Sequence, residues 1–160
     1  MMRTLLALAV LATAVPATAM DMEYFKSMAK QQATQQVESK LGLAQAAPAN
    51  AKATIISPKN GDTVKSPVTV VFGLSNMGVA PAGVNQPNTG HFHLLIDEPA
   101  VNLAQPLPAS AQVVHYGAGQ IEAVLDLKPG KHTLQALMAD WKHQPHNPAV
   151  ISEKITITVK

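Results

Sequence analysis

Short apolar segments that alternate from Ala53 onward constrain the fold of this chain more than any other feature. Val68–Leu74 places every second side chain on one apolar face, and Ile121–Leu127 repeats the pattern. Side chains of a β-strand alternate between two faces, so each segment is expected to be a half-buried strand. Turn-forming pairs such as Asn60-Gly61 and Pro129-Gly130 separate the segments. The pattern predicts an all-β domain.

Seven such segments lie within residues 53–160, and about seven short strands in this length are typical of an immunoglobulin-like antiparallel sandwich. They are Thr54–Ile56, Val68–Leu74, His91–Asp97, Val113–Tyr116, Ile121–Leu127, Lys131–Asp140 and Ile151–Val159. Alternation predicts two inward-facing sets, Ile121, Ala123, Leu125 and Leu127 in one strand and Ile151, Ile155, Ile157 and Val159 in the last.

The first nineteen residues have the composition of a signal peptide. Arg3 precedes an apolar run from Thr4 to Val15, and Ala17-Thr18-Ala19 forms a small-residue cleavage site. The run of about a dozen residues is shorter than the roughly 20 that a membrane-spanning helix needs. We expect cleavage after Ala19, a periplasmic or secreted location, and no membrane span afterwards.

An amphipathic helix is predicted at residues 20–43 and a linker at 44–52. Asp21 can cap the helix, apolar residues from Met22 onward recur at helical spacing, and Gly42 is a plausible stop. The apolar stripe is weak, which favours loose attachment to the sandwich at 53–160.

Charge and motifs exclude several functions. Lysine and arginine number 12 against 10 acidic residues, and the lysines are scattered singly, which argues against nucleic-acid binding. The chain has no cysteine, so it can form neither a disulfide nor a blue-copper site. No H-E-x-x-H, G-x-S-x-G or Gly-rich phosphate motif occurs, so no enzyme activity is expected.

Two histidines within one predicted strand give the first sign of a metal site. In His91–Asp97 the side chains of His91, His93 and Asp97 share one face, whereas Phe92 takes the core side. Imidazoles at i and i+2 lie roughly 7 Å apart at the backbone and can converge on one ion. The alternative is a pair of solvated histidines on an exposed strand face.

Four further histidines lie in three other segments. His143 and His146 occupy a Pro-stiffened loop that begins at Asp140, and loops held by a sandwich often carry binding residues. His115 lies in a short middle strand. His132 shares a face with Leu134, so it is either a ligand or a core-edge histidine bonded to backbone.

Together these segments predict a histidine-rich metal site. The predicted ligands are His91, His93, His115, His132, Asp140, His143 and His146. Asp97 is available as a carboxylate ligand or as a partner that orients one. Imidazole donors suit Cu(II), Zn(II) and Ni(II), and the thioethers of Met77 and Met138 would favour copper. Copper and zinc are the expected metals. The predicted mature N-terminus, Met20-Asp21-Met22, has no histidine for a site at that end.

Several motifs resemble the bacterial periplasmic family DUF4399, a domain of unknown function, over about residues 53–160. They are Ile56–Val64, Phe72–Leu74, Gly78–Gly83, Gly90–Asp97, Gly130–Gln135 and Pro145–Pro148. The motif positions carried over by this resemblance are His91, His93, Asp97, His115, His132, Asp140 and His146. The family often has three consecutive histidines where this chain has Phe92 between two, so a role for the middle one is lost.

Two functions from different classes remain open. The first is a periplasmic metal-binding protein, with copper the expected ion, that sequesters or delivers metal without catalysis. The second is an envelope interaction module that binds a protein or glycan. In that case the loops Asn76–Gly90 and Ala100–Ser110 would make the contact, and the histidines would be hydrogen-bonded structure.

Overall fold

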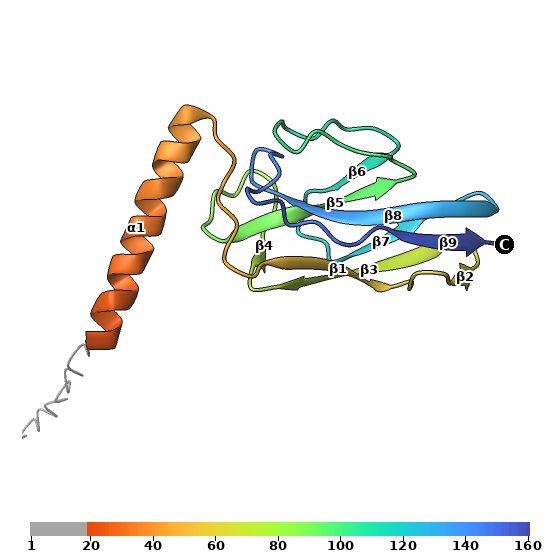
Figure 1. Ribbon diagram of the computed structural model, residues 1–160, viewed down its shortest axis with the longest axis horizontal. Helices are drawn as coiled ribbons and strands as arrows, with labels where there is room; N and C mark the ends of the chain where they lie inside the picture. Colours follow the sequence, from red (N-terminus) through yellow and green to blue (C-terminus); the bar gives the residue numbers. More distant parts are fainter. Residues whose placement is uncertain (1–18) are drawn as a thin grey trace, which may run out of the picture.

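The computed structural model describes residues 19–160, and the predicted signal peptide up to residue 18 lies outside the described residues. Helix α1 spans Ala19–Leu41, close to its predicted bounds. Gly42 follows it with a φ of 68°, the left-handed conformation that commonly ends a helix. Figure 1 shows α1 projecting from one end of a β-sandwich, with the C-terminus at the opposite end.

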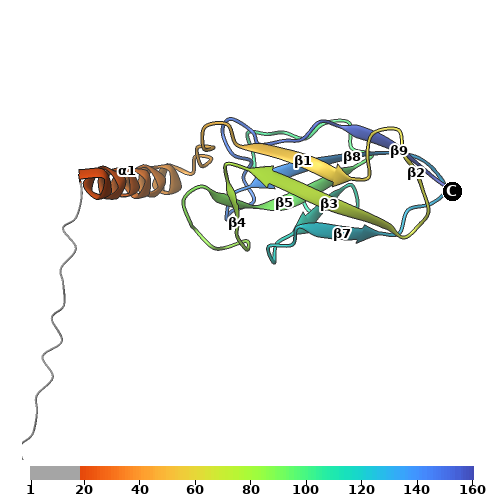
Figure 2. The ribbon, with the colours of Figure 1, turned by 90° about the horizontal axis from the view of Figure 1, so that it is seen from below.

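The nine strands of the described residues form two sheets, which confirms the predicted all-β sandwich. The strands are β1 (Lys52–Ser57), β2 (Thr63–Val64), β3 (Val68–Ser75), β4 (Gly78–Val79), β5 (Thr89–Ile96), β6 (Val113–Tyr116), β7 (Glu122–Leu125), β8 (Gly130–Ala139) and β9 (Ile155–Val159). One sheet has the order β1-β3-β7; the other has the order β2-β9-β8-β5-β4, with β6 also paired to β5. The smaller sheet lies in front of the larger in Figure 2. The two-residue strands β2 and β4 were not predicted. Strand β2 pairs in parallel with β9, and β4 pairs in parallel with β5.

The main core fills the space between the sheets. Phe72 of β3 stacks on Phe92 of β5 with ring centroids 4.6 Å apart, and Leu94, Leu134 and Ile157 are fully buried around them. A second, smaller apolar cluster lies on the outer face of the six-stranded sheet, beneath the loop that joins β5 to β6. It consists of Leu95, Leu107, Val113, Leu137 and Ala139, with Val101 and Ile151 at its edge. The larger sheet is therefore covered on both faces at this point.

Two of the predicted inward-facing residues are placed wrongly by the alternation pattern. Ile121 precedes β7 and is 57% exposed. Ile151 pairs with Leu137, whereas Ile155 pairs with Leu134, so the last segment has one residue more than β8 between these pairs. That extra residue reverses the alternation, and Ile151 joins the outer cluster rather than the main core.

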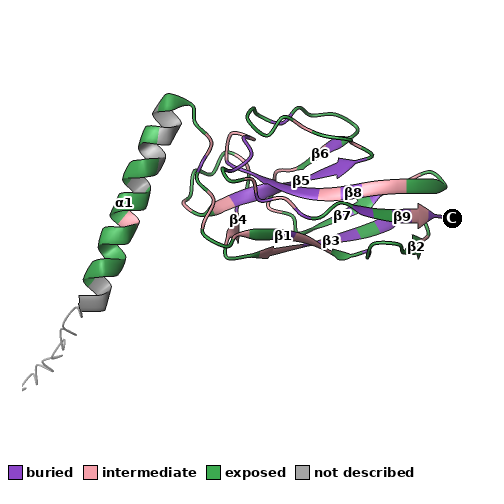
Figure 3. Cartoon of the chain, in the orientation of Figure 1, coloured by how far each residue is buried: buried purple, intermediate pink, exposed green. Residues whose placement is uncertain are grey.

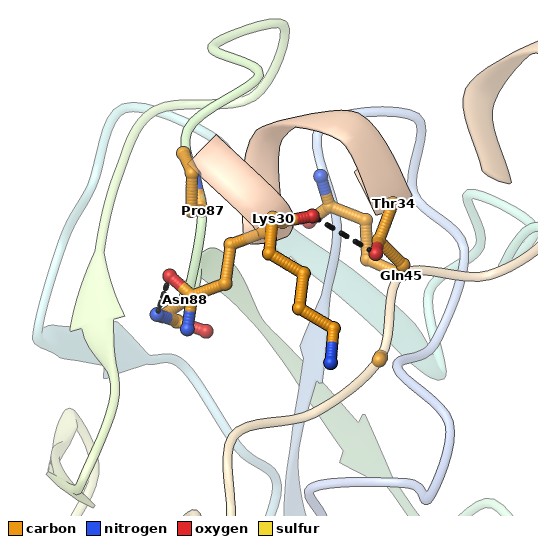
Figure 4. A pocket seen from close by; sticks show the side chains of 7 residues that line it. Lys30, Thr34, Gln45, Pro87 and Asn88 are labelled. Atoms are coloured by element: carbon orange, nitrogen blue, oxygen red, sulfur yellow. Dashed lines mark hydrogen bonds between the residues drawn. The ribbon is translucent and has the colours of Figure 1, made fainter. Parts of the chain in front are cut away.

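The side chains of α1 that the structure describes lie mostly away from the sandwich. Most of them are exposed (Figure 3), including Tyr24 and Phe25 at 62% and 64%. Figure 4 shows a pocket lined by Lys30 and Thr34 of the helix together with Gln45, Pro87 and Asn88. There Asn88 Nδ2 donates a hydrogen bond to Gln31 Oε1 at 3.3 Å. Within the described part of the chain, no helix is long and apolar enough to cross a membrane.

Candidate metal centre

The histidine pair of β5 lies on the outer face of the larger sheet. Phe92, between the two, points into the main core, so alternation directs His91 and His93 to the opposite side. There His91 is fully buried and His93 is 3% exposed. The solvated alternative is therefore wrong, because loops cover this face and β5 runs between β6 and β8.

His115 and His143 complete a group of four histidines. His115 of β6 pairs directly with His93 across the ladder, which places both side chains on the same face of the sheet. His143 reaches the same point from the loop after β8. One ring nitrogen from each of His91, His93, His115 and His143 lies within 4.8 Å of those of the other three. The closest ring centroids, those of His115 and His143, are 4.6 Å apart.

A tight turn begun by Asp140 presents His143 to the group. The backbone N–H of His143 donates to the carbonyl oxygen of Asp140 at 2.9 Å. Asp140 Oδ1 accepts hydrogen bonds from the backbone N–H groups of Lys142 and Gln144, at 2.8 and 3.0 Å. His143 itself has a φ of 68°, which a non-glycine residue rarely adopts without tight surroundings. Asp140 therefore acts on the site by shaping this loop.

The environment keeps the buried pair neutral. Burial, followed by the repulsion of neighbouring histidines, lowers the pKa of His91 to about 4 and that of His93 to about 3. Burial is also the largest cause that lowers the pKa of His115. A neutral imidazole keeps one nitrogen lone pair free, which is the form that binds a metal ion. His91, His93 and His115 are thus ready to donate to a metal ion at neutral pH.

Several ring nitrogens of this group are buried without a hydrogen-bond partner in residues 19–160. They are Nδ1 and Nε2 of His91, Nδ1 of His93 and Nδ1 of His143. A buried polar atom left unpaired costs about 1–3 kcal/mol, so such atoms call for a partner. A metal ion supplies one for a nitrogen of each ring.

The spacing of the four nitrogens fits a single ion after a small contraction. Nitrogens bound at about 2.0–2.1 Å in a tetrahedron lie about 3.3 Å from one another. The four ring nitrogens lie within 4.8 Å of one another, so side-chain rotations that move each nitrogen by an ångström or so bring them to this spacing. The donor set is four imidazoles, which suits zinc, copper and nickel.

His132, one of the predicted ligands, lies outside the group and has a different role. Its Nδ1 lies 2.7 Å from Asp97 Oδ2, and its Nε2 lies 2.9 Å from the carbonyl oxygen of Lys128. Both partners are acceptors, so both ring nitrogens must carry protons and neither has a lone pair for a metal. The alternative of a core-edge histidine bonded to backbone describes it better.

The His132–Asp97 pair predicts a pH dependence of stability. The hydrogen bond to Asp97, followed by that to the Lys128 carbonyl, raises the pKa of His132. Its stabilisation is therefore fully present below the unfolded value of about 6.5 and is lost as pH rises through the folded pKa. At pH 5.5 wild type should have a higher free energy of unfolding than His132→Ala, by about 1 kcal/mol or less because the pair is partly exposed. This difference should disappear as the pH rises to 9. Urea unfolding with a chelator present measures it. An advantage independent of pH would contradict this account of His132.

The other predicted donors also lie outside the four-histidine group. His146 is 2% exposed and packs over Gly90, where a Cβ atom would lie 2.8 Å from its Nε2. Met138 is fully buried in the main core and Met77 packs against that core, so neither thioether contributes to the group. The methionines therefore give no reason to prefer copper over zinc or nickel.

Comparison with known proteins identifies the family. The model of DUF4399, a domain of unknown function, matches residues 70–160, and the chain belongs to this family. No curated protein sequence matches the chain. Among solved structures, an endo-β-1,4-mannanase from Thermotoga petrophila is similar over 69% of this chain and 20% of its own, with 16% identity and a TM-score of 0.43. The chain thus spans about a fifth of that enzyme's length.

Proposed function

We propose that this protein is a periplasmic metal-binding protein that holds one divalent transition-metal ion for sequestration or delivery. The observation that carries the proposal is the convergence of His91, His93, His115 and His143 from three separate segments, with ligand atoms within 4.8 Å of one another. Chance surface histidines would not account for two buried imidazoles with buried ring nitrogens, both of His91 and Nδ1 of His93, that have no hydrogen-bond partner in the described chain.

Copper is the proposed ion. Four imidazoles without a carboxylate or a thiolate suit Cu(II), Zn(II) and Ni(II), and among these Cu(II) heads the general order of affinity. The predicted signal sequence supports export of the protein to an oxidising compartment. There Cu(II) is accessible, and histidine resists oxidation better than cysteine does.

The number of ligands supports storage or delivery over catalysis. Catalytic zinc sites keep three protein ligands and leave a fourth position for water or substrate, whereas structural sites are filled by four. Here four imidazoles stand ready to fill the site. The competing proposal of an interaction module needs hydrogen-bonded structural histidines. His132 fits that description, whereas His91, His93 and His143 have buried ring nitrogens without a partner in the described chain.

Calorimetric titration of the purified chain with Cu(II) and with Zn(II) at neutral pH tests the proposal. One ion per chain is expected, with a Kd below about 1 µM, and copper should bind more tightly than zinc. Electron paramagnetic resonance of the copper form should show nitrogen ligands only. Binding weaker than micromolar for both ions would overturn the proposal.

A further inference from the structure

The four histidines differ in their access to solvent. His91 and His93 are enclosed within the sheet, at 0% and 3% exposed. His143 is half-buried, and His115 is exposed on β6, which pairs only with β5 in the described sheet. The group is therefore closed on the β5 side and open on the β6 side.

This difference sets the order in which ligands can leave a bound ion. When His91 or His93 releases the ion, a buried nitrogen loses its partner and water cannot replace it. The same holds for Nδ1 of His143. His115 has no such buried unpaired nitrogen, so water can solvate its ring once it has let go. Detachment of His115 is thus the least costly first step.

Gly117 controls where the ring of His115 lies. A Cβ atom at this position would overlap Cε1 and Nε2 of His115 and would lie 3.2 Å from the Cβ of Ala82. Gly117 does not have a positive φ, so an alanine there is allowed by its own backbone conformation. The glycine is required for the space that the inward-facing imidazole occupies.

We infer that His115 is the exchangeable ligand of the site, through which the ion is taken up and released, and that Gly117 is the residue that positions it. An incoming nitrogen or carboxylate donor of the metal acceptor takes the place of His115 while His91, His93 and His143 still hold the ion. This inference rests on the proposed metal-binding function.

Two variants and a matched control test it, with EDTA as the acceptor. The copper-loaded chain is mixed with excess EDTA, and the loss of the copper absorbance gives the release rate. His115→Ala and Gly117→Ala should both retain copper yet release it at least about tenfold faster than wild type. Gly78→Ala is the control. The closest atom to its new Cβ would be the Thr89 methyl group, at 3.2 Å, followed by the Asn88 carbonyl oxygen at 3.8 Å, so its rate should stay within about twofold of wild type.

Equilibrium affinity separates the exchangeable ligand from the fixed ones. His93→Ala should lose about 100-fold in copper affinity, whereas His115→Ala should lose about tenfold. Equal losses in the two variants, or a wild-type release rate in Gly117→Ala, would overturn the inference. Since His115 is exposed, its alanine variant keeps the test valid even if Gly117→Ala folds poorly. If the wild-type chain binds no copper, the result would instead contradict the proposed metal-binding function itself.

Discussion

Replacing both His91 and His93 by alanine is expected to abolish tight metal binding and leave the sandwich folded. The pair supplies the two enclosed ligands; of the two that remain, His143 is half-buried and His115 is exposed. We expect copper affinity to fall at least about 1,000-fold, which corresponds to about 4 kcal/mol.

The fold should survive this double substitution because both side chains lie outside the main core. Their removal leaves space on the outer face, but it also removes buried ring nitrogens that have no partner among the described residues. Circular dichroism and urea unfolding check the fold, and titration with Cu(II) checks the affinity. His132→Ala is the matched control, since this histidine is bonded to Asp97 and should leave the affinity unchanged. Wild-type affinity in the double variant would contradict the site.

Replacing Phe92 by histidine is expected to destabilise the protein without improving metal binding. Phe92 is fully buried and stacks on Phe72 at 4.6 Å, on the opposite face of β5 from His91 and His93. An imidazole there would lose apolar contacts and bury two polar nitrogens. We expect a loss of about 3 kcal/mol in the free energy of unfolding.

The metal affinity of folded Phe92→His is the decisive readout. The new ring points away from the group, so affinity should stay within about twofold of wild type. Phe92→Leu is the control for lost aromatic packing without a buried polar group, and it should lose less stability. A tighter copper complex in Phe92→His would show that the middle position can reach the ion.

The sequence allowed most strands to be predicted and included all four histidines of the group among the predicted ligands, but it placed only two of them together. Period-two alternation identified the seven longer strands, and the same periodicity placed His91 and His93 on one face. The two-residue strands β2 and β4 are too short to carry an alternating pattern. The extra residue before β9 reversed the face of Ile151, which alternation alone could not reveal.

Convergence of the remaining ligands depends on features that no local pattern encodes. His115 meets His93 because of the register between β6 and β5. His143 arrives through a turn whose left-handed residue and buried Asp140 cap are tertiary features. His132 was assigned to the site by residue type, yet its position beside Asp97 makes it an ion-pair partner instead. Met138 was assigned as a donor in the same way, although strand alternation directs it to the core.

X-ray diffraction from crystals of the copper-loaded chain, with anomalous data at the copper edge, tests the central claim most directly. The account predicts one strong anomalous peak per chain, about 2.0–2.1 Å from a ring nitrogen of each of His91, His93, His115 and His143. A peak at His132 or His146, or no peak beside the β5 pair at full copper loading, would contradict it.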